Sequence, residues 1–116
     1  MRKIQLVYSN PVPGMEDEFN QWYSDRHVHE ILRVPGYVSA QRYRVTRHRV
    51  SGSGSSGMPE PPFQYLTLYE VEGDPEAILA RFGEAVSAGQ ITSSPALDPD
   101  FSAYFYEAIG EKIVKR

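Results

Sequence analysis

The chain has 116 residues, of which 41% are hydrophobic, enough to bury the core of one domain spanning residues 1–116. Its 12 basic and 15 acidic residues give a net charge of −3, which argues against a nucleic-acid partner. Cysteine is absent, which excludes disulfides. No run approaches the roughly 20 apolar residues of a membrane helix, so we expect a cytoplasmic protein without a membrane partner.

The first predicted elements are a strand and a helix joined by a proline-rich turn. Apolar and polar residues alternate from Lys3 to Ser9, which is typical of a half-buried strand. Proline and glycine at 11–14 prevent a helix from starting earlier. Acidic residues at 16–18 then favour a helix start, because they stabilise the positive end of the helix dipole.

The apolar stripe of this helix changes its phase along the chain. The first part runs from Met15 to Tyr23, and its continuation would bury Arg26 and Glu30. The later apolar residues, from Val28 to Val34, fall on a different face. Either Arg26 and Glu30 form an ion pair at the helix edge, or the helix bends near residues 26–28 and resets its phase. We favour the bend.

Two strands and a loop are predicted after the first helix. Alternation over 37–48 predicts a strand with polar residues on both faces, and Pro35-Gly36 stops the helix before it. The composition of 51–62 (SGSGSSGMPEPP) predicts a flexible loop. Residues 63–72 (FQYLTLYEVE) predict the next strand.

A helix and a strand complete the chain. Asp74 and Pro75 are typical of a helix start, as a cap and a first-turn proline, and Gly89 is typical of a helix end. Residues 101–109 predict the last strand.

This order of elements predicts a ferredoxin-like βαββαβ fold of the α+β class, an antiparallel four-stranded sheet with two helices on one face. Leu66 and Leu68 are expected to face the helices, leaving Tyr65, Thr67 and Tyr69 on the opposite side. The helix-free face would expose more apolar surface than a monomer normally does. We therefore expect a homodimer through the sheet face, which is a dimeric α+β barrel.

The segment from Glu18 to Tyr43 carries the most specific pattern of the chain. Its elements are Trp22-Tyr23, His27, Leu32, Pro35-Gly36, Ala40 and Arg42-Tyr43. The pattern resembles the signature of EthD-like proteins, members of the dimeric α+β barrel superfamily that also contains antibiotic-biosynthesis monooxygenases, polyketide cyclases and muconolactone isomerases. That family usually has His-x-Pro where this chain has His27-Val28-His29, so a second titratable group replaces the proline that would kink the helix.

His27 is the first candidate catalytic residue. It lies four residues after Tyr23, so the two share a helix face, and its imidazole can act as a general acid or base with Tyr23 as hydrogen-bond partner. Alternatively, His27 is a partly buried residue bonded to a backbone carbonyl. His29 is expected to pair with Asp25 at the surface, and no metal site is expected, because a helix points His27 and His29 in different directions.

Arg42 is the second candidate, since a buried arginine in a strand needs an acidic partner or an anionic ligand. It can clamp a carboxylate or enolate, or pair with Glu70 on the next strand, and we favour the ion pair. Tyrosines of the sheet either line a cavity between the sheets of two subunits or are ordinary packing of the dimer. The candidate ligand-binding residues are Tyr8, Trp22, Tyr65 and Tyr104.

These residues predict a pocket, walled by Tyr23, His27 and Arg42, for a small aromatic or polyketide-like organic molecule. As an enzyme the protein would work without a cofactor. His27 would move a proton beside a carbonyl, while Arg42 or a tyrosine hydroxyl holds the developing oxyanion. Isomerisation, cyclisation and cofactor-free oxygenation all fit. The alternative is a non-catalytic accessory protein that binds a metabolite or a partner enzyme in a degradation pathway.

Overall fold

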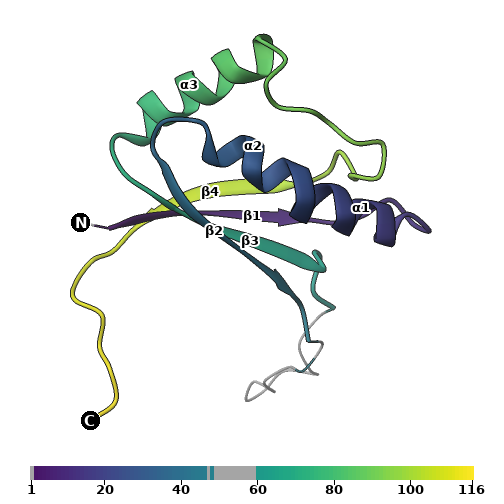
Figure 1. Cartoon of the computed structure of the whole chain (residues 1–116). Helices are drawn as coiled ribbons and strands as arrows, with labels where there is room; N and C mark the ends of the chain where they lie inside the picture. The colour runs from purple at the N-terminus through teal and green to yellow at the C-terminus, as the bar shows by residue number, and fades with distance from the viewer. Residues whose placement is uncertain (1, 47, 49–59) are drawn as a thin grey trace.

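One antiparallel sheet, covered on one face by helices, makes up the protein (Figure 1). The computed structural model describes residues 2–46, 48 and 60–116, so most of the loop predicted over 51–62 lies outside the described residues. In chain order the elements are β1 (Lys3–Ser9), α1 (Glu16–Trp22), η1 (Tyr23–His27), α2 (Val28–Leu32), β2 (Tyr37–Arg44), β3 (Tyr65–Val71), α3 (Pro75–Ser87) and β4 (Ser102–Glu107).

The strand order is β2-β3-β1-β4, and every neighbouring pair is antiparallel. This is the ferredoxin-like arrangement, so the predicted α+β fold class is confirmed. The strand β1 has the predicted bounds, whereas β2 ends at Arg44 rather than His48. Within the described ranges no helix is long and apolar enough to cross a membrane.

Local signals decide where α3 begins and ends. Asp74 Oδ1 accepts a hydrogen bond from the backbone nitrogen of Glu76 at 3.3 Å, and Pro75 stands in the first turn, where its missing N–H costs no hydrogen bond. After the helix, Gly89 adopts a φ of +73°, the left-handed conformation typical of helix ends. Both predicted ends of this helix are confirmed.

The first helix resets its phase through a π-helical turn, η1. With this turn, Phe19 is buried before it and Ile31 is buried after it. The predicted change of phase is therefore confirmed. Arg26 Nε also lies 3.5 Å from Glu30 Oε2, so the ion pair and the reset, considered as alternatives, occur together.

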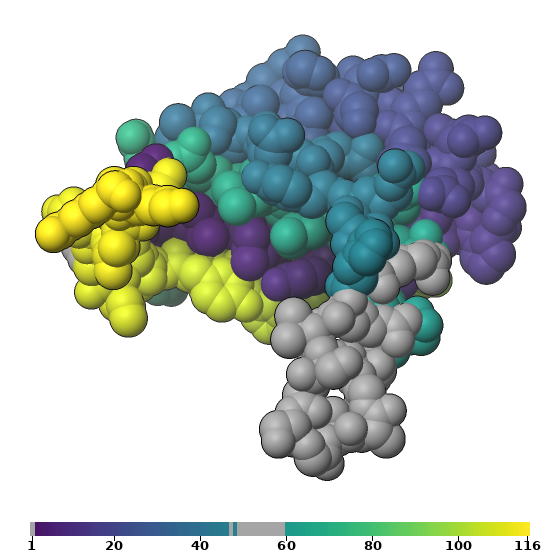
Figure 2. All heavy atoms as spheres, turned by 90° about the horizontal axis from the view of Figure 1, so that it is seen from below, coloured from purple at the N-terminus to yellow at the C-terminus, as the bar shows by residue number. Residues whose placement is uncertain are grey.

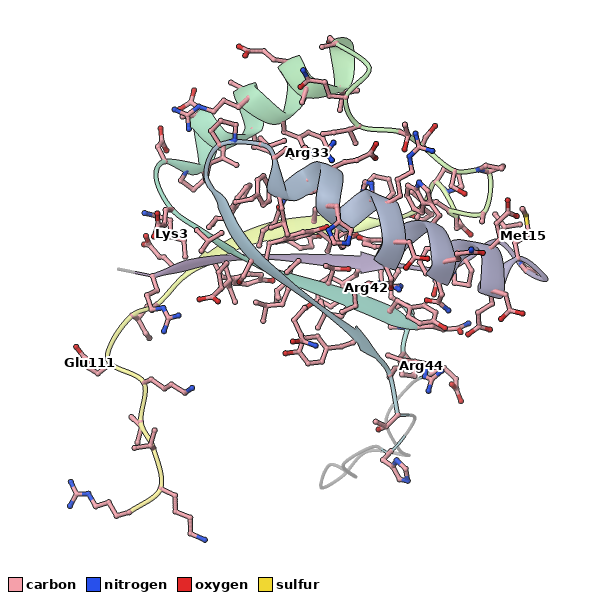
Figure 3. All side chains as sticks on the ribbon, viewed as in Figure 1. Lys3, Met15, Arg33, Arg42, Arg44 and Glu111 are labelled. Atoms are coloured by element: carbon pink, nitrogen blue, oxygen red, sulfur yellow. The ribbon has the colours of Figure 1, made fainter. Side chains whose placement is uncertain are left out.

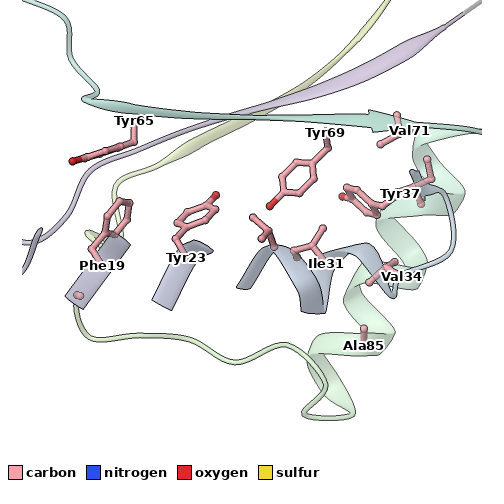
Figure 4. Close-up of a cluster of buried hydrophobic side chains, with 12 residues drawn as sticks. Phe19, Tyr23, Ile31, Val34, Tyr37, Tyr65, Tyr69, Val71 and Ala85 are labelled. Atoms are coloured by element: carbon pink, nitrogen blue, oxygen red, sulfur yellow. The ribbon is translucent and has the colours of Figure 1, made fainter. Parts of the chain in front are cut away.

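The sheet turns the aromatic side of β3 toward the helices. Tyr65 and Tyr69 are 5% and 2% exposed beneath them, and the ring of Tyr65 lies 5.2 Å from that of Phe19 (Figure 4). Alternation then puts Leu66 and Leu68 on the opposite side, so the predicted assignment of the two faces is wrong. The reason is tertiary, because the helix layer presents aromatic rings against which the tyrosines of β3 pack.

The side of the sheet without helices is called the open face below, and Figure 2 views it from beneath. Its large side chains are Ile4, Leu6, Tyr8, Tyr43, Leu66, Leu68, Tyr104 and Tyr106. Of these, Tyr43, Tyr104 and Tyr106 are about half exposed. The open face is thus a broad surface rich in tyrosine and leucine.

Candidate functional site

A cavity of about 220 Å³ lies between the sheet and the helix layer. Its walls are formed by Gln5, Val7, Ser9, Tyr23, His27, Ile31, Tyr37, Tyr69, Leu79, Phe82, Leu97, Phe101 and Ala103. Figure 4 shows Tyr23 reaching from the helix layer, and Tyr69 from β3, toward the same space. The cavity therefore lies on the helix side of the sheet.

The π-helical turn brings Tyr23 and His27 to the cavity wall together. The His27 ring stacks on Trp22, with centroids 4.5 Å apart, and meets the Tyr23 ring edge-on at 4.9 Å. His27 Nδ1 is buried without a hydrogen-bond partner in the described part of the chain. The alternative interpretation, in which a backbone carbonyl holds His27, therefore finds no support among these residues.

Burial keeps the His27 imidazole neutral. It lowers the pKa of His27 to about 4, because the imidazolium ion would be poorly solvated there; Glu30 raises this pKa and Arg42 lowers it further. At neutral pH the ring is therefore a free base. Its own affinity for a proton is weak, so it needs a nearby negative charge to hold one.

Arg42 of β2, labelled in Figure 3, contacts the ring of Tyr23 and is not part of the cavity wall. Its guanidinium carbon lies 4.5 Å from the centroid of the Tyr23 ring, a cation–π contact. Nη1 donates to Ser24 Oγ at 2.8 Å, and Nη2 donates to Asn20 Oδ1 at 2.9 Å. Arg42 therefore acts on the cavity through the tyrosine, by its charge.

The ion pair that we favoured between Arg42 and Glu70 is not formed. Glu70 lies on the open face, where it accepts a hydrogen bond from Ser39 and pairs with Arg2, and these contacts lower the pKa of its carboxyl group. A register shift near the start of β2, between residues 37 and 39, is the cause. One extra residue there reverses the alternation, so Arg42 pairs with Thr67 and points to the helix layer.

Three hydroxyl groups that line or adjoin the cavity come from the sheet. Ser9 on β1 and Thr67 and Tyr69 on β3 are 1%, 1% and 2% exposed, and their side-chain oxygens lack hydrogen-bond partners within the described residues. Burial raises the pKa of Tyr23, while hydrogen-bonding interactions of its hydroxyl with Thr67, Tyr69 and Ser9 lower it in part, although none of these contacts is a well-formed hydrogen bond. The sequence did not indicate Ser9 and Thr67 as site residues. Alternation along a strand places them on one face, but it does not show that this face is the buried one.

Gln5 and Tyr37 are further polar groups of the wall that the sequence did not indicate. The Tyr37 hydroxyl donates to Gln5 Oε1 at 2.6 Å, across the sheet. Burial raises the pKa of Tyr37 to about 12, and the hydrogen bond to Gln5 opposes this in part. Tyr37 thus remains protonated at neutral pH and fixes the orientation of the Gln5 amide.

Of the predicted site residues, only Tyr23 and His27 line the cavity. Tyr8 and Tyr104 lie on the open face, on the other side of the sheet. Tyr65 is buried under the helix layer but outside the cavity wall, where its hydroxyl accepts from Asn20 and donates to Glu16. Trp22 contacts His27 from outside the wall.

The predicted surface pair of Asp25 and His29 is not formed among the described residues, whose ion pairs are those of Arg2 with Glu70 and Arg26 with Glu30. In the same ranges no three histidine, cysteine, aspartate or glutamate side chains come together to hold a metal ion.

No protein-family model and no curated protein matches the sequence, but solved structures match its fold. The heme-degrading protein MhuD of Mycobacterium tuberculosis, with two hemes in its active site, is 17% identical over 95% of this chain and 98% of its own, with a TM-score of 0.64. The monooxygenase ActVA-Orf6 of Streptomyces coelicolor, in complex with nanaomycin D, is 15% identical over 98% and 92%, with a TM-score of 0.57.

SnoaB, a cofactor-independent oxygenase of Streptomyces nogalater, is 15% identical over 96% of this chain and 97% of its own, with a TM-score of 0.56. At these identities the likeness concerns the fold. The chain has the α+β fold of the dimeric α+β barrel proteins, and the resemblance seen in its sequence is confirmed at that level.

Proposed function

We propose that the protein is an enzyme that acts on a small aromatic or polyketide-like molecule in the cavity, and that its first step is the transfer of a proton from this molecule to His27. The observation that carries the proposal is a neutral imidazole in the wall of a mainly apolar, aromatic-lined cavity. A well-formed apolar cavity with a few convergent polar groups and a perturbed titratable residue is the common form of a small-molecule site.

The size of the cavity limits the ligand. Its volume of about 220 Å³ is below the roughly 300–1,000 Å³ of pockets for drug-sized molecules. A compound of two or three fused rings therefore suits the space better than a large macrocycle. Leu79, Phe82 and Phe101 would contact the faces of such rings.

The proton transfer needs help from the surroundings. A phenol has a pKa of about 10, against about 4 for His27, so the transfer is unfavourable for the isolated groups. An anion formed about 4 Å from the imidazolium stabilises the imidazolium by about 4 kcal/mol at an effective dielectric constant of about 20. This energy closes about three units of the gap between the two pKa values. Donors that hold the oxyanion must supply the rest.

Isomerisation, cyclisation and cofactor-free oxygenation all begin with such an anion. In the oxygenation of a ring CH₂ group, molecular oxygen takes the electrons of the anion. One oxygen atom becomes the new carbonyl, and the other leaves as water with the two hydrogens of that carbon. The similar folds of SnoaB, a cofactor-independent oxygenase, and of ActVA-Orf6, a monooxygenase in complex with nanaomycin D, support this class of reaction.

We also infer a homodimer through the open face. Tyr104, for example, is 55% exposed there, and a continuous surface of this kind is larger than monomers usually leave in water. Apolar residues after β4, Ile109, Ile113 and Val114, are also exposed, and a second copy that covers the sheet can cover them too. Dimeric proteins of the same fold support this occupant over an unrelated partner.

The test begins with binding. Trp22 is the only tryptophan of the chain and stacks on His27, so its fluorescence reports on the cavity. Nanaomycin D and 1,8-dihydroxyanthrone are titrated into the protein, and oxygen uptake with the anthrone is then followed in an oxygen electrode. We expect quenching with both, and oxygen uptake that His27→Gln abolishes while binding is kept.

Binding without any turnover would favour the alternative, a non-catalytic protein that binds a metabolite. Equal oxygen uptake by the wild type and His27→Gln would reject His27 as the base. Hemin is titrated as a third ligand, because MhuD degrades heme; a shifted Soret band with no binding of the two smaller molecules would reject the proposed substrate class.

A further inference from the structure

Four hydroxyl groups lie together at one end of the cavity, three of them from residues of its wall and the fourth, that of Thr67, from a residue outside the wall. They belong to Ser9, Tyr23, Thr67 and Tyr69, and we call this group the hydroxyl recess. All four residues are at most 2% exposed, and the three sheet oxygens have no hydrogen-bond partner within the described residues. A buried hydroxyl without a partner is rare, because the loss of its contact with water is not compensated. The Tyr23 hydroxyl is their common neighbour, but it makes no well-formed hydrogen bond with any of the three, so the group keeps hydrogen-bonding capacity that a ligand oxygen can use.

The register of the strands brings these hydroxyl groups together on one face of the sheet. Thr67 and Tyr69 are two residues apart on β3, so both point to the helix layer. Thr67 pairs with Val7 of β1, which makes Ser9 its diagonal neighbour on the same face. Tyr23 closes the group from the helix side, as its position opposite Tyr69 in Figure 4 shows.

The recess suits a negatively charged oxygen. Hydroxyls donate hydrogen bonds to an anion, and burial raises the pKa of both Tyr23 and Tyr69, so these two keep their protons at neutral pH. No aspartate or glutamate is among the residues that line the cavity. The nearest cation in contact with the recess is Arg42, 4.5 Å from the centroid of the Tyr23 ring.

We propose that the hydroxyl recess binds the carbonyl or phenolate oxygen of a planar aromatic ligand and holds the negative charge of its anion. The ring body would then lie against the apolar wall at Phe82 and Phe101, and the oxygen would lie beside Tyr23 and His27, whose rings are 4.9 Å apart. This inference rests on the proposed function, since it names the oxygen atom on which the negative charge lies after His27 has taken a proton from the ligand.

The test compares two ligands of the same size and shape. 2-Hydroxy-1,4-naphthoquinone is an anion at neutral pH, whereas 1,4-naphthoquinone is neutral, and calorimetry gives the dissociation constant of each. Ser9→Ala and Tyr69→Phe each remove one hydroxyl of the recess from the cavity wall. Tyr65→Phe is the matched control, because the Tyr65 hydroxyl is bonded to Asn20 and Glu16 and lies outside the cavity wall.

We expect the wild type to prefer the anion. Ser9→Ala and Tyr69→Phe should each weaken its binding about tenfold or more, as the loss of a hydrogen bond to a charged group does, and affect the neutral ligand less. Tyr65→Phe should change neither. Without ligand, the two recess variants should keep or raise the thermal midpoint, because each removes a buried hydroxyl that has no partner.

Three results would reject the proposal that the hydroxyl recess binds an oxygen atom of the ligand. The first is equal affinity of the recess variants and the wild type for the anion. The second is a lowered thermal midpoint of both variants without ligand, because the hydroxyls would then be part of an internal network. The third is a wild type that binds neither quinone. Oxygen uptake, measured in parallel with the anthrone, separates the two proposals. Hydroxyl-dependent binding without turnover would retain the recess and reject the enzymatic function.

Discussion

Acid should destabilise the protein through His27, and the effect can be calculated. The pKa of this residue falls from 6.5 to about 4 on folding, because burial disfavours the imidazolium ion. Below pH 6.5 the unfolded chain binds a proton that the folded chain does not, so stability is full above this pH and falls as the pH approaches 4. The full shift is worth about 3 kcal/mol, and about 2 kcal/mol of it is lost between pH 7 and pH 5.

The assay is urea denaturation at pH 7, 6 and 5, followed by circular dichroism, for the wild type and His27→Gln. Replacing His27 also removes its stacking on Trp22, so the variant should be less stable at pH 7. Between pH 7 and pH 5 the variant should nevertheless lose about 2 kcal/mol less of its free energy of unfolding than the wild type loses. His29→Gln, which removes an exposed histidine two residues away, should keep the wild-type pH dependence.

Parallel curves for the wild type and His27→Gln between pH 7 and pH 5 would refute the reasoning. The proton uptake would then come from other groups, and the His27 ring would not be a buried neutral base. The same outcome would remove the observation that carries the proposed proton transfer.

Two further predictions concern the backbone and the open face. Gly36 has a φ of +109°, and a Cβ there would lie 2.6 Å from Ile78 Cγ1, so Gly36→Ala should lower the free energy of unfolding by about 2 kcal/mol or more. Gly83→Ala, in α3 with open space around it, should raise the free energy of unfolding by about 0.5–1 kcal/mol. Urea denaturation measures both variants. An unchanged stability of Gly36→Ala would contradict the close approach of Gly36 to Ile78. Leu68→Glu on the open face should convert the proposed dimer to a monomer, as measured by light scattering. Gln90→Glu, at an exposed site, should leave the dimer intact. A Leu68→Glu variant that stays dimeric would exclude the open face as the interface.

Much of the fold could be predicted because it depends on local interactions. The strand β1 has its predicted bounds, and α3 starts at Asp74 and Pro75, because alternation, capping and proline act within a few residues. The reset in the first helix was also visible, since a stripe that would bury Arg26 cannot continue in phase. The pair of Tyr23 and His27 was found for the same reason, as residues four apart share a helix face.

The location of the site could not be read in this way. Alternation along β3 shows that the strand has two faces, but which face the helices cover depends on the rings that they present, such as Phe19 against Tyr65. Tyr8 and Tyr104 were therefore grouped with Tyr23, although they lie on the open face and the cavity lies on the helix side of the sheet.

The partner of Arg42 shows the same limit more sharply. One extra residue at the start of β2 reverses the direction of every later side chain, and it takes Arg42 away from Glu70 to the ring of Tyr23. Strand bounds and helix caps are therefore determined by the sequence itself, because neighbouring residues decide them. The hydroxyl recess and the cation behind Tyr23 are decided only by tertiary structure, because they depend on the register between strands that are distant in the chain.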